Sequence, residues 1–282
     1  MGDTPVAAKP ATPGASCMFA VGTRAPGVTD DFLDQAKTWV AAIVTAVGTG
    51  TARRDLGTAA ASAASIKALS DTAAKDGALT VAQLDANLGG LRGHTLVLVT
   101  HGLDVDPAWT SQEQDDSQGL LLYNKTVGRN SSADIILMNA HLARMKIDGD
   151  KVVADIAGLD LTDPDTAAFV NAVTAMVAVV DAIRQAVFAQ VYLAACGGGH
   201  RLDKFGKRLA TLTGKTLYWN DQKIFLPTKP TTPFAEVGVE QPGGGFTLRK
   251  GFGYFGARTG AASVDLKSGT DTFLPGSTHR EP

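Results

Sequence analysis

Cysteine is nearly absent from this chain, with only Cys17 and Cys196 among its 282 residues. Two cysteines are too few for the disulfide scaffold on which many small secreted domains depend. The first residues also lack a basic region leading into an apolar stretch, which is the pattern of a secretory signal. We therefore expect a cytoplasmic protein, or one that is delivered by a non-classical route.

An excess of positive charge is missing as well. The 26 Lys and Arg residues against 28 Asp and Glu residues give a formal net charge of −2. Nucleic-acid-binding proteins usually concentrate Lys and Arg to neutralise phosphates, so no nucleic-acid partner is expected. The chain also has no uninterrupted apolar run near the roughly 18 residues of a membrane span, so no membrane partner is expected either.

The residue patterns of metal and phosphate sites are absent. No spacing of His, Cys and Asp matches a zinc site. The acidic residues between Asp104 and Asp116 lack the glycine and terminal Glu of an EF-hand loop, so calcium activation has no support. His94, His141 and His279 lie in expected turns or polar segments and are interpreted as surface residues. We expect no metal and no cofactor.

Length and composition predict one α/β domain at 15–256, between a flexible segment at 1–14 and a polar tail at 257–282. A hairpin-rich insertion is expected at 103–163, including a hairpin around Asp148-Gly149. Another hairpin is expected where 234–240 and 246–255 flank a glycine-rich turn. Oligomeric state is not encoded in these patterns.

Apolar strands alternate with amphipathic helices along this domain. We predict strands at 17–21, 65–69, 95–101, 191–196 and 215–219, and helices at 30–47, 80–91, 164–190 and 202–213. Asp30-Asp31 offers an N-cap for the first of these helices, Gly48 and Gly50 end it, and Gly214 ends the last. Helices between strands require crossover connections, and these produce a mostly parallel sheet covered on both faces. The expected fold is therefore a three-layer α/β/α sandwich with hairpin insertions.

Two of the predicted strands end in reactive residues. The strand at 95–101 ends in His101-Gly102, and the strand at 191–196 ends in Cys196 followed by three glycines. The carboxyl ends of parallel strands border the crevice where α/β proteins bind ligands, so His101 and Cys196 are predicted to meet there. A thiol beside an imidazole is the arrangement of a cysteine nucleophile and its base. Cys17 begins its strand and is expected at the opposite edge.

The order of these elements resembles the caspase-like cysteine peptidases, which include caspases, metacaspases, legumain, clostripain, gingipains and domains of bacterial toxins and effectors. The resemblance spans about 16–219 and depends on the two apolar blocks that end in His101-Gly102 and Ala195-Cys196-Gly197. It implies a caspase-like fold and a cysteine endopeptidase with a His101–Cys196 dyad. It also implies an oxyanion hole formed by the backbone amides of Gly102 and Cys196, because such donors stabilise the negative charge that develops during acyl transfer.

Substrate preference has two opposing candidates. The resemblance implies a charged pocket for the side chain before the scissile bond. Arg24, after the first strand, would select an acidic side chain, whereas Asp221, after the strand at 215–219, would select a basic one. Asp221 is slightly favoured, with Trp219 and Asn220 as a pocket wall. Both charges are equally compatible with a solvated surface role.

Alternatives to a peptidase remain open at this point. A cysteine at the end of a buried strand is more often a small core residue, and His-Gly is a common dipeptide. A caspase-like binding or scaffold module without catalytic activity is one alternative, and a cysteine amidase or thioesterase with the same dyad is another. For the peptidase, self-processing is expected in exposed linkers such as 108–118 or 227–233.

Overall fold

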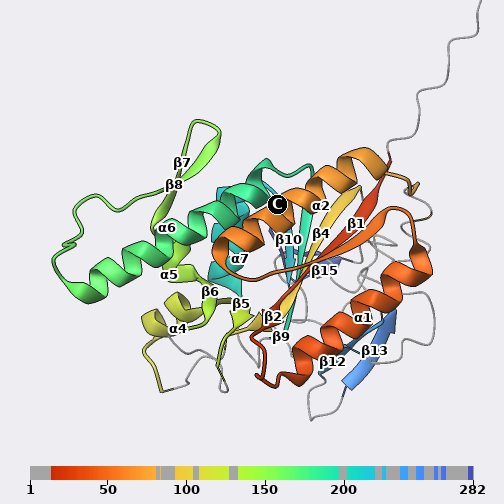
Figure 1. Ribbon diagram of the computed structural model, residues 1–282, viewed down its shortest axis with the longest axis horizontal. Helices are drawn as coiled ribbons and strands as arrows, with labels where there is room; N and C mark the ends of the chain where they lie inside the picture. The colour runs from red at the N-terminus through yellow and green to blue at the C-terminus, as the bar shows by residue number, and fades with distance from the viewer. Residues whose placement is uncertain are drawn as a thin grey trace, which may run out of the picture.

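The computed structural model (Figure 1) describes residues 14–80, 83, 93–103, 108–126, 133–196, 202–219, 224–226, 236–240, 246–250, 257–259, 262–264 and 279–281. Its helices are α1 (Asp31–Val47), α2 (Ala59–Asp76), α4 (Ser111–Ser117), α5 (Asn139–Leu142), α6 (Pro164–Gln185) and α7 (Asp203–Thr213). The predicted helix at 80–91 lies almost entirely outside the described residues. So do the predicted linker at 227–233 and most of the segment at 1–14.

A mostly parallel sheet forms the centre of the molecule. Its main strands are β1 (Ser16–Val21), β3 (Thr51–Asp55), β4 (His94–Gly102), β9 (Gln190–Cys196), β10 (Thr216–Trp219) and β16 (His279–Glu281). They are arranged in the order β16-β10-β9-β4-β1-β3, with β16 antiparallel to β10 and the other neighbours parallel. The chain changes direction across the sheet between β1 and β4, and ligands bind at such switch points in open α/β sheets.

The two faces of the sheet bury separate apolar cores, because side chains alternate along each strand. Leu96 and Leu98 of β4 belong to the core under α2, α6 and α7, whereas Val97 and Val99 belong to the core under α1. The predicted α/β architecture is confirmed at this level. We call these two sides the three-helix face and the α1 face.

The second strand is where the sequence-based prediction was wrong. Residues 65–69 lie inside α2, where Ile66, Leu69 and Ala73 recur at helical spacing and are buried. The strand is instead β3, a polar edge strand of sequence Thr-Ala-Arg-Arg-Asp. It lacks the apolar alternation on which strand prediction depends, because among the described strands it pairs with β1 alone, at the border of the sheet.

The insertion after β4 extends the sheet rather than standing apart from it. It contributes β5 (Gly119–Asn124) and β6 (Ile135–Met138), and the two-residue β2 (Thr23–Arg24) pairs with β5. β1 accompanies β4 only as far as Val99, and β5 then pairs antiparallel with His101 and Gly102. The end of β4 therefore lies between β5 and β9.

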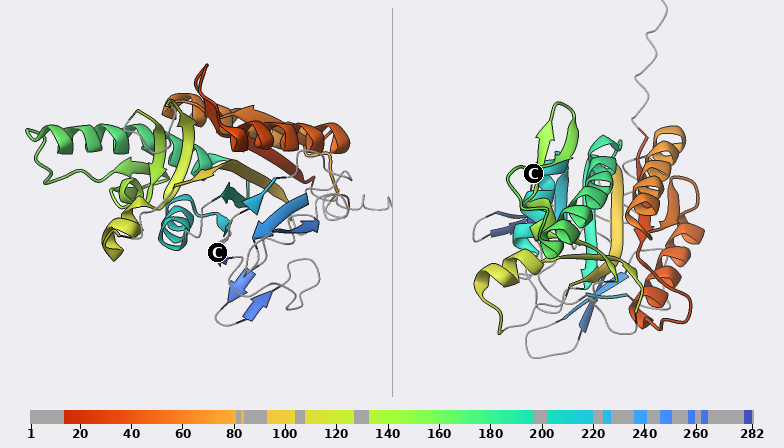
Figure 2. Two further views of the ribbon diagram at one scale, coloured as in Figure 1. Left: turned by 90° about the horizontal axis from the view of Figure 1, so that it is seen from below. Right: turned by 60° about the vertical axis from the view of Figure 1, so that its left-hand side comes forward.

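Several smaller elements complete the fold. The predicted hairpins are confirmed as β7 (Met145–Asp148) with β8 (Lys151–Ala154), and β12 (Glu236–Glu240) with β13 (Phe246–Lys250). The first of them lies beside α6 (Figure 2). The remaining short strands are β11 (Ile224–Phe225), β14 (Ala257–Thr259) and β15 (Ala262–Val264). The predicted linker at 108–118 differs from expectation, because 111–117 forms α4 behind a capping box of Thr110 and Glu113.

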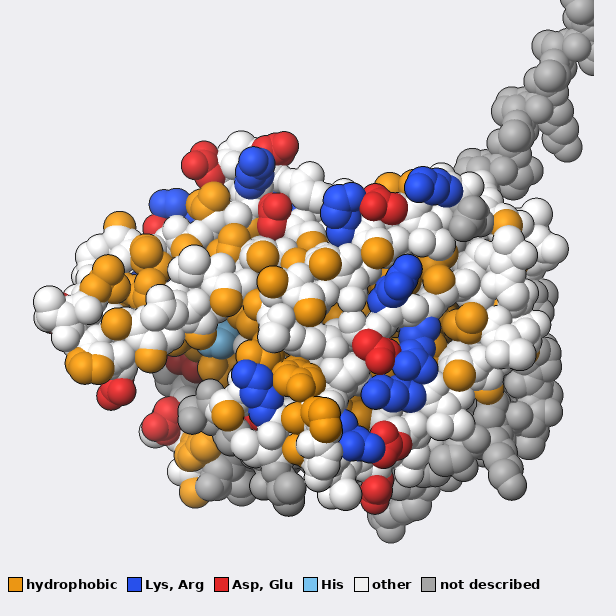
Figure 3. All heavy atoms as spheres, in the orientation of Figure 1, with side chains coloured by type: hydrophobic (Ala, Val, Ile, Leu, Met, Phe, Trp, Pro, Cys, Tyr) orange, Lys and Arg blue, Asp and Glu red, His pale blue; other side chains and the backbone are white. Residues whose placement is uncertain are grey.

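Helix α6 is long and apolar. It has 22 residues, and its most apolar 18-residue stretch has a mean hydropathy of 1.8. By length and composition alone, such a helix is sufficient to cross a membrane. It packs along α2, as Figure 1 shows, and alanines line the outer seam between the two helices. Hydrophobic side chains are scattered over the face seen in Figure 3 among charged ones. A core helix satisfies the same test, so this is weak evidence for a membrane span.

Candidate active site at the carboxyl edge of the sheet

The ends of β4 and β9 bring His101 and Cys196 together. The two strands pair in parallel register from Thr95 opposite Gln190 to His101 opposite Cys196. Neighbouring strands lie about 4.8 Å apart, so these positions are adjacent in space. Side chains two residues apart in a strand lie on the same face of the sheet. Val99 in β4 and Ala194 in β9 belong to the core under α1, so positions 101 and 196 are also on the α1 face.

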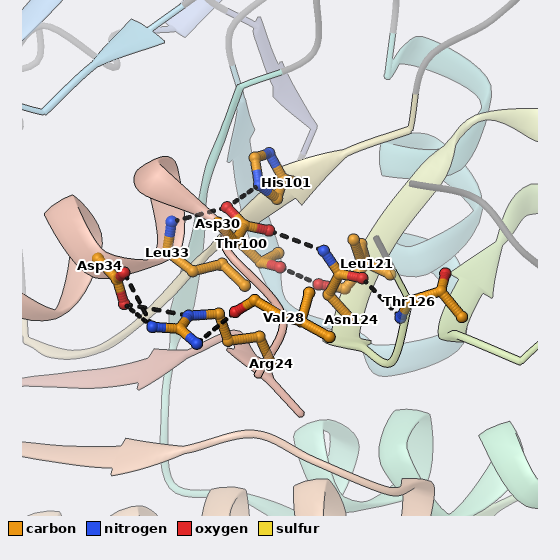
Figure 4. A network of polar contacts seen from close by, with 10 residues as sticks. All are labelled: Arg24, Val28, Asp30, Leu33, Asp34, Thr100, His101, Leu121, Asn124 and Thr126. Carbon is orange, nitrogen blue, oxygen red and sulfur yellow. Dashed lines mark hydrogen bonds and ion pairs between the residues drawn. The ribbon is translucent and has the colours of Figure 1, made fainter. Parts of the chain in front are cut away.

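The imidazole of His101 is held by a buried carboxylate. Its Nε2 lies 2.8 Å from Oδ1 of Asp30, and the two side chains are only 2% and 3% exposed (Figure 4). Asp30 Oδ1 also accepts a hydrogen bond from the Leu33 amide at 3.1 Å. Asp30 Oδ2 accepts one from Asn124 Nδ2 at 2.9 Å. Three donors from three parts of the chain therefore converge on one carboxylate.

These contacts keep Asp30 ionised. Burial alone would raise the pKa of its carboxyl group, but the hydrogen bond and charge of His101, with the Asn124 and Leu33 donors, lower it to about 2. An ionised carboxylate only accepts hydrogen bonds, so Nε2 of His101 carries the proton that is shared with Asp30. In the neutral imidazole, Nδ1 is then the nitrogen with the free lone pair.

The second ring nitrogen is available for chemistry. Nδ1 of His101 is buried and has no hydrogen-bond partner within the described ranges. The ring also contacts Phe32 in the first turn of α1, with centroids 4.6 Å apart. The imidazole is therefore fixed at one nitrogen and on one face, and its basic nitrogen has no partner among the described residues.

Local sequence explains why Asp30 is positioned here. It is the predicted N-cap of α1, with an extended backbone and a side chain that bonds the Leu33 amide. The preceding loop is held by Arg24, which pairs with both carboxylate oxygens of Asp34 at 3.2 and 3.0 Å and also donates to the Val28 carbonyl. The guanidinium proposed for an acid-selecting pocket is thus already engaged in holding this loop.

Of the other predicted pocket residues, the structure describes only Trp219, and it does not lie beside His101. Trp219 is 1% exposed and packs in the core of the three-helix face, on the side of the sheet opposite His101. It covers Gly206, where an added Cβ would lie 2.7 Å from the indole ring. Asn220 and Asp221 lie outside the described residues, as do the three glycines after Cys196.

The predicted oxyanion-hole residues are the terminal residues of adjacent strands. Gly102 is the last residue of β4, and Cys196 is the last residue of β9. Cys17 occupies the opposite end of the sheet, opposite Thr95 at the start of β4. It is fully buried, and burial raises the pKa of its thiol well above the ordinary value, which disfavours the reactive thiolate at neutral pH.

Asp30 was predicted only as a helix cap, and Asn124 was not among the predicted site residues. The position of Asp30 just after β1, on one side of the switch point, was the available signal for a site residue. Among the residues that the structure describes, no group of three side chains suits a metal ion. No family model, curated protein or solved structure matches the chain, so the functional proposal depends on this site.

Proposed function

We propose that this protein is a caspase-like cysteine endopeptidase in which Cys196 is the nucleophile and His101 is the base. The observation that carries the proposal is the register of β4 and β9, which sets His101 opposite Cys196 on the α1 face. The orientation of the imidazole supports it, because Nδ1 is left without a partner in the described structure. The parallel sheet and the two apolar blocks that end in His101-Gly102 and Cys196-Gly197 support the caspase-like assignment.

The proposed reaction divides peptide hydrolysis into two acyl transfers. The Cys196 thiol gives its proton to His101 Nδ1, and the thiolate attacks the peptide carbonyl carbon. The backbone amides of Gly102 and Cys196 stabilise the resulting oxyanion. His101 returns the proton to the leaving amine, and a thioester remains on Cys196. Water then attacks the thioester, gives a proton to the thiolate through His101 and releases the new carboxylate.

The substrate in this proposal is a protein or peptide with a basic side chain before the scissile bond. Arg24 is paired with Asp34 at 3.0 Å, which favours Asp221 over Arg24 as the charge that selects it. Cytoplasmic location, independence of any cofactor, and the lack of nucleic-acid or membrane partners belong to the same proposal. Self-processing belongs to it too, although α4 makes 111–117 a poorer cleavage segment than an open linker.

The test compares Cys196→Ala with the matched variant Cys17→Ala. We expect the wild type and Cys17→Ala to cleave a mixed peptide library after Arg or Lys, and Cys196→Ala to cleave nothing. Intact mass, followed over time, detects self-processing in the same samples. Cleavage after Asp would overturn the assignment of Asp221.

Two other results would overturn the peptidase itself. Labelling of Cys196 by a thiol-reactive probe without any peptide cleavage would indicate an amidase or thioesterase. Absence of both labelling and cleavage would indicate a binding module, provided that circular dichroism shows the protein to be folded.

A further inference from the structure

Three distant segments meet on the carboxylate of Asp30. Asp30 lies in the loop before α1, His101 is the penultimate residue of β4 and Asn124 is the last residue of β5. Asp30 is 71 positions from His101 and 94 positions from Asn124 in the sequence. All three residues are at least nine-tenths buried. Figure 4 shows the carboxylate between the imidazole and the amide, with the helix terminus beside it. This arrangement is more elaborate than a helix cap requires.

We propose that Asp30 is a positioning residue that holds His101 in the Nε2–H tautomer and so makes Nδ1 the proton acceptor for Cys196. The inference rests on the proposed function and extends the implied dyad by a third residue. Asn124 in turn holds the carboxylate, because its amide donates to the oxygen that His101 does not contact.

Capping alone does not account for a buried aspartate at this position. One acceptor oxygen satisfies the Leu33 amide, and Ser, Thr or Asn would supply it without burying a charge. A buried carboxylate is costly unless it is paired and hydrogen-bonded. Here its two oxygens take up His101 and Asn124 in addition to the cap. The choice of Asp is therefore explained by the imidazole and not by the helix.

The loop that carries Asp30 is held at several points. Arg24 binds Asp34 and the Val28 carbonyl, and the Ala25 amide donates to the Asn124 carbonyl at 2.7 Å. Arg24 and Asp34 are the other charged groups of the network, and they neutralise each other as an ion pair. Asp30 thus supplies the negative charge that faces His101 within the network.

The role of Asp30 in the reaction follows from the proton balance. When the Cys196 thiol transfers its proton to Nδ1, the imidazole becomes an imidazolium and the thiol becomes a thiolate. The Nε2 proton stays on the ring, in its hydrogen bond to Asp30. The carboxylate therefore stabilises the thiolate–imidazolium pair without itself accepting a proton.

The first test measures the rate of Cys196 alkylation by iodoacetamide from pH 5 to pH 9, with peptide mapping to exclude Cys17. Asp30→Asn keeps the size and the cap but removes the charge, and Asp30→Ser keeps the cap but loses the imidazole contact. We expect both to lower the rate at pH 6 by about 10- to 100-fold, with a smaller loss at pH 9, where the thiol ionises without help.

The matched control for this test is Asp31→Asn. Asp31 is an exposed carboxylate in the same turn of α1. We expect a pH profile for this variant like that of the wild type. Equal profiles for Asp30→Ser and the wild type would overturn the positioning role.

The second test is independent of Cys196 chemistry. Long-range ¹H–¹⁵N spectra of imidazole-labelled protein report which His101 nitrogen carries the proton. We expect the Nε2–H tautomer in the wild type and a mixture of tautomers in Asp30→Ser. A wild-type Nδ1–H tautomer would overturn the inference. A third outcome is that Asp30 determines the His101 tautomer while Cys196 does not react with iodoacetamide. This result would refute the proposed peptidase but leave the positioning role of Asp30 intact.

Discussion

Two histidines of this protein are almost completely buried, yet they lie in opposite chemical surroundings. His101 is 1% exposed and His141 is 4% exposed. His101 bonds a carboxylate through one nitrogen, whereas His141 accepts from the Met138 amide at 3.3 Å and has a further backbone hydrogen bond with Ile136. The ring of His141 also packs against Phe169 of α6. His141 caps the short helix α5, and the surface position expected for it was wrong.

The difference shows that burial alone does not mark a catalytic histidine. Burial lowers the pKa of His141 to about 4, because charging a ring that is removed from water is costly and the backbone hydrogen bond with Ile136 offsets only part of that cost. The imidazole is therefore held neutral, with its nitrogens satisfied by the backbone. At His101 a carboxylate faces one nitrogen, and the other is unpaired within the described structure. An acid on one side and a free nitrogen on the other form the pattern of a base.

The largest expected effect separates the two histidines by activity. We expect His101→Ala to lower Cys196-dependent peptide cleavage by about 10³-fold, because the general base is removed. His141→Ala should leave the cleavage rate of the folded protein within about threefold while lowering its stability by about 2 kcal/mol. Steady-state cleavage and urea unfolding provide the two readouts. Equal losses of activity in both variants would contradict the assignment of His101, and not His141, as the general base.

The next effect tests His141 through the pH dependence of stability. Its pKa of about 4 lies below the ordinary histidine value of 6.5, so between these values the unfolded chain binds a proton that the folded protein does not. The contribution of neutral His141 to the free energy of unfolding is fully present above pH 6.5 and is lost as the pH falls to about 4. The total loss is about 3 kcal/mol. The urea unfolding free energy of His141→Gln should lack this loss. A parallel decline in both proteins would contradict the assignment.

The smallest effect concerns Asp30 at lower pH. Its pKa of about 2 lies below the ordinary aspartate value of 3.8, so its contribution to stability is present above pH 3.8 and disappears as pH falls toward 2. We expect Asp30→Asn to remove about 1–2 kcal/mol of acid-sensitive stability at pH 5. Acid titration of unfolding in the presence of urea measures it, with Asp31→Asn as control. An unchanged acid transition would contradict the lowered pKa.

Local patterns were enough to predict much of the α/β framework. Helix caps and tight turns depend on contacts between residues that are close in the sequence, so they can be recognised from the sequence alone. Examples are the Asp30 cap of α1, the Gly48 and Gly214 ends of α1 and α7, and the Asp148-Gly149 turn. The apolar strands β4 and β9 were visible for the same reason. β3 was missed because an edge strand need not be apolar.

The candidate site was predictable only in part. Parallel strands place their carboxyl ends at one edge, and this rule alone was enough to suggest that His101 and Cys196 lie near each other. No comparable rule linked Asn124 to them, because β5 belongs to an insertion. Arg24 was proposed as a pocket residue because sequence does not reveal that Asp34, one helical turn into α1, pairs with it.

The sequence by itself determined helices α1, α6 and α7, the buried strands β4 and β9 and the reactive residues at the ends of these strands, because these properties follow from hydrophobic period and capping over short distances. Only the tertiary structure decided that β5 takes the place of β1 beside the end of β4 and that Asp30, His101 and Asn124 converge there. These contacts depend on strand order and register across the sheet. Strand pairing of this kind is set by global packing, and local sequence leaves it open.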